Sequence, residues 1–499
     1  MLSLFMTARE WRPKPLATGW RRAVVWTGLF TAILTLAVGS LPLASASSSS
    51  GAIAPWSVAS SSSTVSTQLS MQRSTVVDNV SSEFWGIDLS PTEKLDTDRS
   101  DDLAAAGIGY ILWPSAKLND EYDLVDNIIH KGDGSTSRPR TDASAFVDWC
   151  RSIECHAIIG VPGEINNTTF VEEEVKYLVD TLHFQPAFWE IGNEPGLWKH
   201  YNIPWSQWSS TQNSGITPQG YAELVHRYIS AMHSVDSTAQ IIGLPGTGLG
   251  HDQEPIWIYD TVKLNGPHLA AVSIHVYPAP HLHGSEATLS RFDHSLVGKA
   301  SIERRARVDW NEIHSACPTC HIALMITEFN AATVGVISDS GPYSKFMSGF
   351  DEVPYIAALV TQALQERVSN LDLYDLQSAF SGAMIASNGT PRPLYYLYSD
   401  MLVHLDPKAV DTNFSGSLGD FFGEVTIGNG TAMSLLLVNA NPSMTVRVDL
   451  AGSGFTVDKS GTSWNYTSST SRPTEKKWSG SIPDIWTLPP ECVILIQVE

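Results

Sequence analysis

Two glutamates stand in separate acidic motifs, and each lies at or just past the end of an apolar run. FWEIGNEP at 188–195 contains Glu194, and MITEFN at 325–330 contains Glu328. A buried parallel strand reads as a continuous apolar run, so each motif is predicted to end a strand. Two carboxyl groups that face each other across a sugar are the minimum apparatus for breaking a glycosidic bond. One protonates the departing oxygen, and the other attacks the anomeric carbon or activates water.

Eight short segments must position these glutamates. They are the run that leads into Glu194 and the segments 84–89, 108–113, 157–161, 241–244, 272–277, 322–327 and 371–376. Amphipathic patterns, for example at 219–235 and 353–367, predict helices between them. Strands that alternate with helices predict an α/β fold, a parallel (β/α)8 TIM barrel. Active sites of such barrels lie at the C-terminal ends of the strands, where both glutamates fall.

The pattern changes after about residue 400, where short alternating strands are predicted at 421–427, 433–439, 445–450 and 492–498. Turn residues such as Asn429-Gly430 separate them, which favours a C-terminal antiparallel β-sandwich. We therefore expect four parts: a targeting segment at 1–46, a serine-rich tether with an N-terminal strand at 47–80, the catalytic barrel at 81–400 and the sandwich at 401–499. The N-terminal strand, at 64–77, is expected to pair with the sandwich.

With these motifs in place, the chain resembles a retaining glycoside hydrolase of clan A. Within that clan it is most similar to the heparanase and β-glucuronidase family, with the xylosidase and arabinofuranosidase families as runners-up. The resemblance implies that Asn193-Glu194 is the pair after strand four, with Glu194 the acid/base, and that Glu328 is the nucleophile. It also implies that His275 and Tyr277, in AAVSIHVYP at 270–278, are the signature of strand six.

Retention of configuration needs the two carboxyl groups about 5 Å apart, and we expect this short spacing. Glu328 is expected to be ionised. Glu194 is expected to be protonated, because the charge of Glu328 and partial burial raise its pKa. Asn193 is expected to bind the sugar 2-hydroxyl, and His275 and Tyr277 to contact Glu328 or the substrate.

The loop after Glu194 is rich in aromatic residues: Trp198, Tyr201, Trp205 and Trp208. Aromatic faces suit the C–H faces of pyranose rings, so Trp198 in particular is predicted to bind substrate. The alternative is a small apolar core under a long loop. For Glu190, a place in a second layer behind the site and an ion-paired interior position both remain open.

One segment departs from the clan pattern. Members of this type often read LRxPGG after strand two, whereas this chain reads ILWPSA at 111–116, so the arginine and both glycines are missing. The loop borders the sugar pocket, and its change bears on the substrate. Arg138 and Arg140 are the nearest candidates to bind a uronate carboxylate, and their alternative is a solvated loop position.

Charge and composition exclude several partners. The 31 basic and 52 acidic residues give 31 − 52 = −21. Nucleic acids and anionic membranes both need a basic footprint, so neither is an expected partner. The expected partner is an oligosaccharide, polysaccharide or glycoside. The proposed chemistry needs no metal or cofactor, and we assign none.

The first 46 residues are predicted to be a secretory signal. Basic residues precede an apolar run at 23–39, and Ala44 and Ala46 fit a cleavage site. An uncleaved membrane anchor is the alternative, and either way the catalytic part is expected outside the cytoplasm. Several Asn-X-Ser/Thr triplets are compatible with glycosylation. The five cysteines suggest short disulfides, Cys150 with Cys155 and Cys317 with Cys320, and a buried Cys492. A redox CxxC and a four-cysteine zinc site are the alternatives.

Two hypotheses of different class follow. The first is a secreted retaining glycoside hydrolase that works by double displacement with two glutamates and has β-glucuronidase-like specificity. The second is a non-catalytic carbohydrate-binding or cell-surface protein that keeps the barrel fold. The presence of both Glu194 and Glu328 favours the first.

Overall fold

The computed structural model describes residues 63–95, 107–201, 215–279, 294–332, 346–378, 381–416, 418–455, 460–468 and 472–498. The predicted signal and most of the serine-rich tether, at 1–62, lie outside these residues, as do Trp205 and Trp208. Residues Ser60–Glu499 form one compact unit. Because the barrel and the C-terminal sheet both belong to that unit, the predicted boundaries at 80 and 400 stay predictions.

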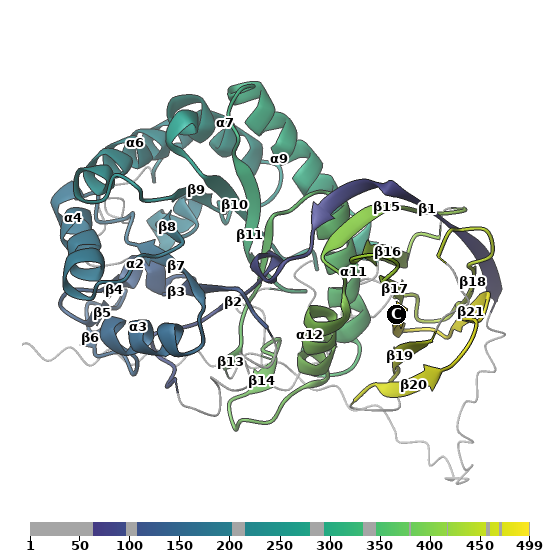
Figure 1. The fold of residues 1–499 in the computed structure, drawn as a ribbon. Coiled ribbons are helices and arrows are strands. Elements are labelled where there is room, and N and C mark those ends of the chain that lie inside the picture. The colour runs from purple at the N-terminus through teal and green to yellow at the C-terminus, as the bar shows by residue number, and fades with distance from the viewer. Residues whose placement is uncertain are drawn as a thin grey trace, which may run out of the picture. The chain divides into compact units, whose positions relative to one another are not determined.

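A closed barrel of eight parallel strands confirms the predicted fold class (Figure 1). In chain order its strands are β2 (Trp85–Asp88), β3 (Tyr110–Trp113), β7 (His156–Val161), β8 (Phe188–Ile191), β9 (Ile241–Pro245), β10 (Ala271–Val276), β11 (Ala323–Phe329) and β12 (Asn370–Leu373). The ring closes where β12 pairs with β2. Nearly every residue of these strands is buried, which is why they read as continuous apolar runs.

Helices follow the barrel strands and surround them (Figure 1). They are α3 (Ala143–Ser152), α4 (Thr168–Lys176), α6 (Pro218–Val235), α7 (Glu254–Asn265), α9 (Ile302–Ala316), α11 (Glu352–Gln365) and α12 (Pro393–His404). Helix α6 shows how sequence sets such an element. Pro218 starts it, and the Thr217 side chain caps it by accepting from the Gly220 N–H. Its buried face repeats at helical spacing, with Tyr221, Leu224 and Val225 as its first members.

Short elements occupy the loops between the main ones. They are η1 (Ser82–Phe84), α2 (Leu118–Glu121), β4 (Tyr122–Asp123), β5 (Ile128–His130), β6 (Thr136–Ser137), η2 (Tyr177–Thr181), η3 (Pro195–Leu197), α5 (Trp198–Tyr201), η5 (Gly266–His268), β13 (Gln377–Ser378) and β14 (Ile385–Ala386). Two groups of them, α2 with β4–β6 and η3 with α5, lie between barrel strands and the helices that follow, and both bear on the site.

The C-terminal sheet has nine strands in the order β20-β19-β22-β17-β16-β15-β1-β18-β21. Their bounds are β1 (Thr64–Asn79), β15 (Lys408–Phe414), β16 (Phe421–Ile427), β17 (Met433–Asn439), β18 (Thr445–Asp449), β19 (Gly461–Tyr466), β20 (Thr474–Trp478), β21 (Ile485–Leu488) and β22 (Cys492–Val498). The sheet encloses an apolar core that includes Leu69, Leu435, Val448 and Ile496, so the predicted sandwich is confirmed.

The N-terminal strand β1 lies inside this sheet, between β15 and β18. Its first residues pair with β18 and its later residues pair with β15. The pairing with β18 is parallel, so the sheet is not wholly antiparallel as predicted. A chain segment that arrives from outside the C-terminal meander is free to run in either direction, whereas strands joined by short turns must alternate.

The cysteines resolve the alternatives that the sequence left open. Cys150 is bonded to Cys155 and Cys317 to Cys320, and Cys492 is a buried free thiol. The two pairs therefore do not form one zinc site. Within the described parts of the chain, no helix combines the length and the apolar character needed to cross a bilayer.

Candidate active site

Glu194 lies in a tight turn three residues past the end of β8. Gly192 has φ +73°, and a Cβ there would lie 2.6 Å from the Trp198 ring, so the position needs glycine. Glu194 itself has left-handed backbone angles, φ 44° and ψ 62°, which an ordinary residue adopts only when its surroundings hold it. Its N–H donates to the carbonyl of Pro245 at 3.1 Å, and its carbonyl accepts from Leu197 at 2.8 Å.

Glu328 lies inside β11 rather than past its end, because β11 runs two residues further than predicted. Its neighbour across the ladder is His275 of β10, after a register shift that leaves Thr327 unpaired. Such an irregularity re-aims the side chains beyond it. Both Glu328 and His275 are almost fully buried, at 4% and 6% exposure.

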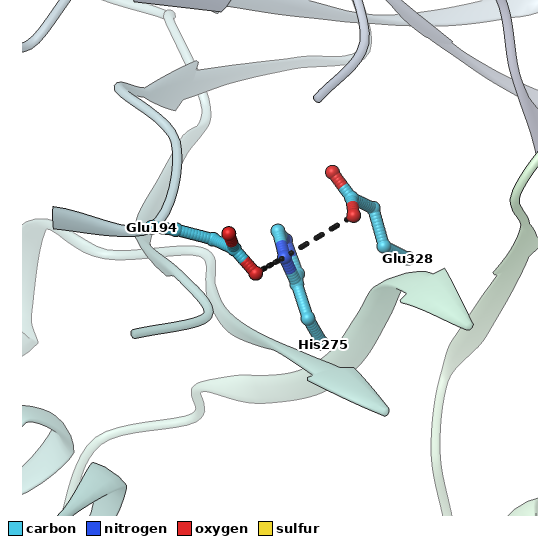
Figure 2. A group of neighbouring side chains, drawn as sticks. All are labelled: Glu194, His275 and Glu328. Carbon is cyan, nitrogen blue, oxygen red and sulfur yellow. Dashed lines mark hydrogen bonds and ion pairs between the residues drawn. The ribbon is translucent and has the colours of Figure 1, made fainter. Parts of the chain in front are cut away.

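The structure brings Glu194, His275 and Glu328 together, as Figure 2 shows. The Nδ1 atom of His275 lies 3.2 Å from Oε1 of Glu194 and 3.4 Å from Oε2 of Glu328. One side-chain atom from each of the three residues lies within 4.8 Å of the other two. This puts the two carboxylates in the range of a retaining glycosidase, about 5 Å, rather than the wider gap that holds a water between them.

A tyrosine donates to each carboxylate. Tyr277 donates its hydroxyl hydrogen to Oε2 of Glu328 at 2.8 Å, and Tyr201 donates to Oε2 of Glu194 at 2.9 Å. The contact between Tyr277 and Glu328 was expected from the sequence. Tyr201 was expected only as a member of the aromatic loop, and the structure shows it as a half-buried hydrogen-bond partner of the acid/base candidate.

The three ionisable groups shift each other's pKa. For His275, burial acts to lower the pKa, but the charges of Glu328 and Glu194 outweigh it and raise the pKa to about 9. Burial raises the pKa of Glu328 to about 7; the Glu194 charge adds to this, and His275 and Tyr277 oppose it. For Glu194, burial acts upward, but the bond and charge of His275 and the bond from Tyr201 outweigh it and lower the pKa.

The pKa of Glu328 is raised and that of Glu194 is lowered, which is opposite to the expectation that Glu194 carries the proton and Glu328 the charge. The physical reason is the position of His275. Its Nδ1 lies slightly nearer Glu194, which also receives the Tyr201 hydroxyl and the field of Arg305. None of these contacts can be read from the sequence spacing. The same three atoms also have the donor chemistry of a divalent-cation site. Their observed spacing is accounted for by hydrogen bonds and ion pairs.

The structure corrects one predicted substrate contact and supports another. Trp198 is fully buried, and its Nε1–H lies 2.9 Å from Oδ2 of Asp120 and 2.8 Å from the Asn193 carbonyl oxygen. A ring with no exposed surface cannot stack on a sugar, so the small-core alternative for this residue holds. Asn193 lies beside Glu194, and its side-chain amide makes no hydrogen bond to a described residue. The amide is therefore free to bind a ligand.

Several carboxylates below the site were missed or left open. Asp88, at the end of β2, is fully buried, and neither of its oxygens has a hydrogen-bond partner among the described residues. Burial raises its pKa well above the usual range, and the charges of Glu328 and Asp372 add to the rise. Glu190 is a second-layer residue: it accepts from the Ser273 hydroxyl at 2.9 Å. A lone aspartate at a strand end, as in WGIDLS, is the only signal that pointed to Asp88.

Arg305 is a further buried charge close to the site. From α9 it donates to the backbone carbonyl of His275 and forms an ion pair with Glu254. Its field also lowers the pKa of Glu194. Nothing in the spacing of the sequence links a helix thirty residues downstream to His275, so only the folded structure shows this contact.

No protein-family model matches the sequence, and no curated protein matches it. Solved structures do resemble the fold. The GH51 arabinofuranosidase from Xanthomonas axonopodis pv. citri has a TM-score of 0.69 at 15% identity, and the match covers 87% of this chain and 100% of that one. The α-L-arabinofuranosidase from Thermotoga maritima has a TM-score of 0.67 at 14% identity with the same coverage. A family 44 xyloglucanase from Paenibacillus polymyxa has a TM-score of 0.64 at 11% identity, again with 87% of this chain covered and 99% of that one.

At these identities the likeness establishes the fold and nothing finer. These neighbours are glycoside hydrolases by name, and their names describe arabinofuranosidases and a xyloglucanase. The narrower resemblance to the heparanase and β-glucuronidase family is therefore not established by them. The chain has the (β/α)8 barrel with a C-terminal β domain that such glycoside hydrolases share.

Proposed function

We propose that the protein is a retaining glycoside hydrolase. The observation that carries the proposal is the convergence of Glu194 and Glu328 on one imidazole nitrogen, with oxygens from both within 4.8 Å. Glu328 attacks the anomeric carbon while Glu194 gives its proton to the departing oxygen, so one C–O bond forms as the other breaks. In the second step Glu194 takes a proton from water, and the resulting hydroxide displaces Glu328 from the sugar.

His275 explains how the protons reach the right carboxylates. The substrate-free order leaves the shared proton on Glu328 and the charge on Glu194. Because Nδ1 lies near both carboxylates, the ring first gives its Nδ1 proton to Glu194 and then takes the proton of Glu328. The number of protons in the site is unchanged, and the result is the ionised nucleophile and protonated acid that glycosyl transfer needs.

Asn193 is the proposed sugar contact. Asn193 precedes the acid/base and has a free amide, which suits a hydroxyl next to the anomeric carbon.

For the substrate we favour a glycoside with an anionic sugar, as in a β-glucuronide. A cavity of about 380 Å³ is lined by Lys94 and Arg140, by the acidic Glu93 between strands β2 and β3, and by the loop after β12, including Ser378. That loop is tied back to the site, because Ser378 donates to Asp375, whose charge raises the pKa of Asp88. Arg138 is not available, since it donates to the carbonyls of Asp126 and Asn127. A neutral pentoside is the alternative, in line with the names of the neighbours.

We also propose that the protein acts outside the cytoplasm. The basic and apolar N-terminal segment and the short disulfides both support export. Detection of the mature N-terminus in the culture medium, by peptide sequencing after expression in a secreting host, tests this. Retention of the whole chain in the membrane fraction would favour the uncleaved anchor.

Hydrolysis of aryl glycosides tests the proposed activity. Wild type, Glu194→Gln and Glu328→Gln are assayed on glucuronide, xyloside, arabinofuranoside, glucoside and galactoside, and the anomer released first is identified by NMR. We expect cleavage with retention by wild type and a loss of about 10²–10⁴-fold in each variant. Glu424→Gln, a buried carboxyl change in β16 of the C-terminal sheet, is the control and should keep full activity. Sugar binding without any hydrolysis would favour the non-catalytic alternative.

A further inference from the structure

We propose that Asp120 is a positioning residue for general acid catalysis: it fixes the Asn193–Glu194 turn and so aims the carboxyl group of Glu194. The inference rests on the proposed function, because it concerns how the acid/base is held. Asp120 lies on α2, in the loop where this chain departs from the pattern of its clan.

The carboxylate of Asp120 accepts from N–H groups of the turn before Glu194, of α5 and of the loop after β7. Oδ2 accepts from the backbone of Asn193 at 2.8 Å and from the Trp198 indole at 2.9 Å. Oδ1 accepts from the backbones of Gly163 and Glu164 at 2.9 and 3.2 Å. A carboxylate accepts on both oxygens, whereas the amide of asparagine has one acceptor oxygen and one NH2 donor, so the arrangement suits aspartate. It ties the turn before Glu194 to the loop after β7.

Asn119, the residue before Asp120, also binds the turn before Glu194, and we call these bonds together the attachment. Its Nδ2 donates to the carbonyl of Gly192 at 2.9 Å, while Asp120 accepts from the N–H of Asn193. These are the two polar groups of one peptide unit, and they point in opposite directions. With both held, that peptide plane cannot rotate. The next residue is Glu194, whose left-handed backbone depends on its surroundings.

Glycines make room for this attachment. At Gly160 a Cβ would lie 2.3 Å from Nδ2 of Asn119, and at Gly163 it would lie 2.7 Å from the Trp198 ring. The missing side chains at 160, 163 and 192 let the indole and the Asn119 amide reach the turn. A side chain at any of them would crowd the indole or the Asn119 amide.

Burial argues that the aspartate serves more than stability. Asp120 and Asn119 are 0% and 1% exposed. Burial raises the pKa of Asp120 to about 7, and the four N–H donors oppose the rise. A buried carboxylate is costly to ionise, and an apolar residue of similar size often stabilises a fold as well. The buried carboxylate instead fixes the geometry of the turn, because its donors at Asn193 and Trp198 lie on either side of Glu194 in the chain.

Acid assistance has a kinetic signature that a structural role lacks. A poor leaving group needs the proton of Glu194 as the bond breaks, whereas dinitrophenolate leaves without it. A mis-aimed Glu194 therefore slows glycosides of poor leaving groups most. The quantity to follow is kcat/KM, which reports the first, bond-breaking step.

The experiment compares wild type, Asp120→Asn and Glu174→Gln on phenyl, nitrophenyl and dinitrophenyl glycosides of whichever sugar wild type cleaves. Glu174 is the matched control: it is fully buried and accepts from the backbone of Leu124, away from the turn. For Asp120→Asn we expect kcat/KM to fall about 10–10²-fold on the phenyl glycoside and less than about 3-fold on the dinitrophenyl glycoside. Glu174→Gln should change all three alike. An equal loss on all three by Asp120→Asn would overturn the inference.

Two further measurements separate this inference from the proposed function. Asn119→Ala removes only the hold on Gly192 and should give the same leaving-group dependence if Asp120→Asn does not fold. Hydrogen–deuterium exchange at residues 188–198 needs no activity: it should rise in Asp120→Asn and stay unchanged in Glu174→Gln. Unchanged exchange would refute the attachment even in an active enzyme. Wild type that cleaves no glycoside would refute the hydrolase alone.

Discussion

The Nδ1 atom of His275 lies 3.2 Å from Oε1 of Glu194, and this contact helps to lower the pKa of Glu194 against the effect of its burial. The imidazole is buried and its pKa is raised to about 9, so it carries a charge at neutral pH. A cation between two carboxylates stabilises the ionised form of both. It thereby keeps two acidic groups a few ångströms apart inside a barrel that has little solvent to screen them.

Replacement of His275 by glutamine should move the pH profile of kcat/KM upward on both sides. In wild type we expect activity to fall above about pH 7, where the proton shared by Glu328 and Glu194 is lost. On the acid side it falls as Glu194 becomes protonated as well, below its usual range. Glutamine removes the charge that lowers both pKa values, so both limbs rise. If kcat/KM falls at every pH while neither limb of the profile shifts, His275 does not set the pKa values of the two glutamates.

Tyr201 and Tyr277 form a matched pair for phenylalanine substitution, since each donates one bond to a different glutamate. Tyr277→Phe should lower kcat/KM by about 10-fold on every leaving group, because the nucleophile Glu328 loses a donor that favours its ionised form. Tyr201→Phe should instead affect poor leaving groups most, because it alters Glu194. Identical profiles for the two variants would contradict the assignment of acid/base and nucleophile.

Trp198→Phe distinguishes a structural indole from a sugar platform. The change leaves Oδ2 of Asp120 and the Asn193 carbonyl without the Nε1–H donor, and it opens space beside Gly192. We expect unfolding free energy to fall by about 1–3 kcal/mol and kcat to fall, with KM little changed. Thermal unfolding and steady-state kinetics check both. A rise in KM at unaltered stability would restore Trp198 to the substrate-binding surface.

The barrel strands could be predicted from the sequence, because each strand is buried on both faces and reads as an apolar run. The segments at 421–427, 433–439 and 492–498 match β16, β17 and β22 for a similar reason, since they alternate or run apolar between turn residues. Strands β15, β19, β20 and β21 of the C-terminal sheet were missed. β20, TEKKW, is polar and mostly exposed, so its pairing rather than its composition makes it a strand.

The site was only partly readable from the sequence. Motifs located Glu194, His275, Tyr277 and Glu328, because residues at strand ends meet at one end of a barrel. The proton order, the bond from Tyr201 and the hold by Asp120 depend on side-chain directions across loops. Sequence spacing contains none of these. Trp198 shows the limit best, since an aromatic residue next to a catalytic motif serves equally well as a platform or as a core.

The stability of the folded chain should decrease from pH 5 to pH 8. Burial raises the pKa of Asp78, Asp375 and Glu491 to about 7, so the folded state holds protons that the unfolded chain has already lost near pH 4. Stability therefore falls as pH rises from about 4 and levels off above about 7 for these groups. His275 also makes stability fall as the pH rises, but at higher pH. Its stabilisation of the folded state is fully present below about pH 6.5 and is lost as the pH rises through about 9.

Thermal unfolding as a function of pH measures this slope. The variant Asp78→Asn tests how much of the slope comes from that one carboxyl group. Removal of the carboxyl should flatten the slope between pH 5 and pH 7, because the folded state no longer resists its ionisation there. Asp133→Asn is the control: Asp133 is exposed, and its bonds to Ser135 lower its pKa, so the slope should barely change. A melting temperature that rises steadily from pH 5 to pH 8 would mean that these carboxyls ionise in the fold as readily as in the unfolded chain. The same scan on Asp120→Asn should also flatten the slope, because that carboxylate shares the rise to about 7 while its donors hold the turn before Glu194.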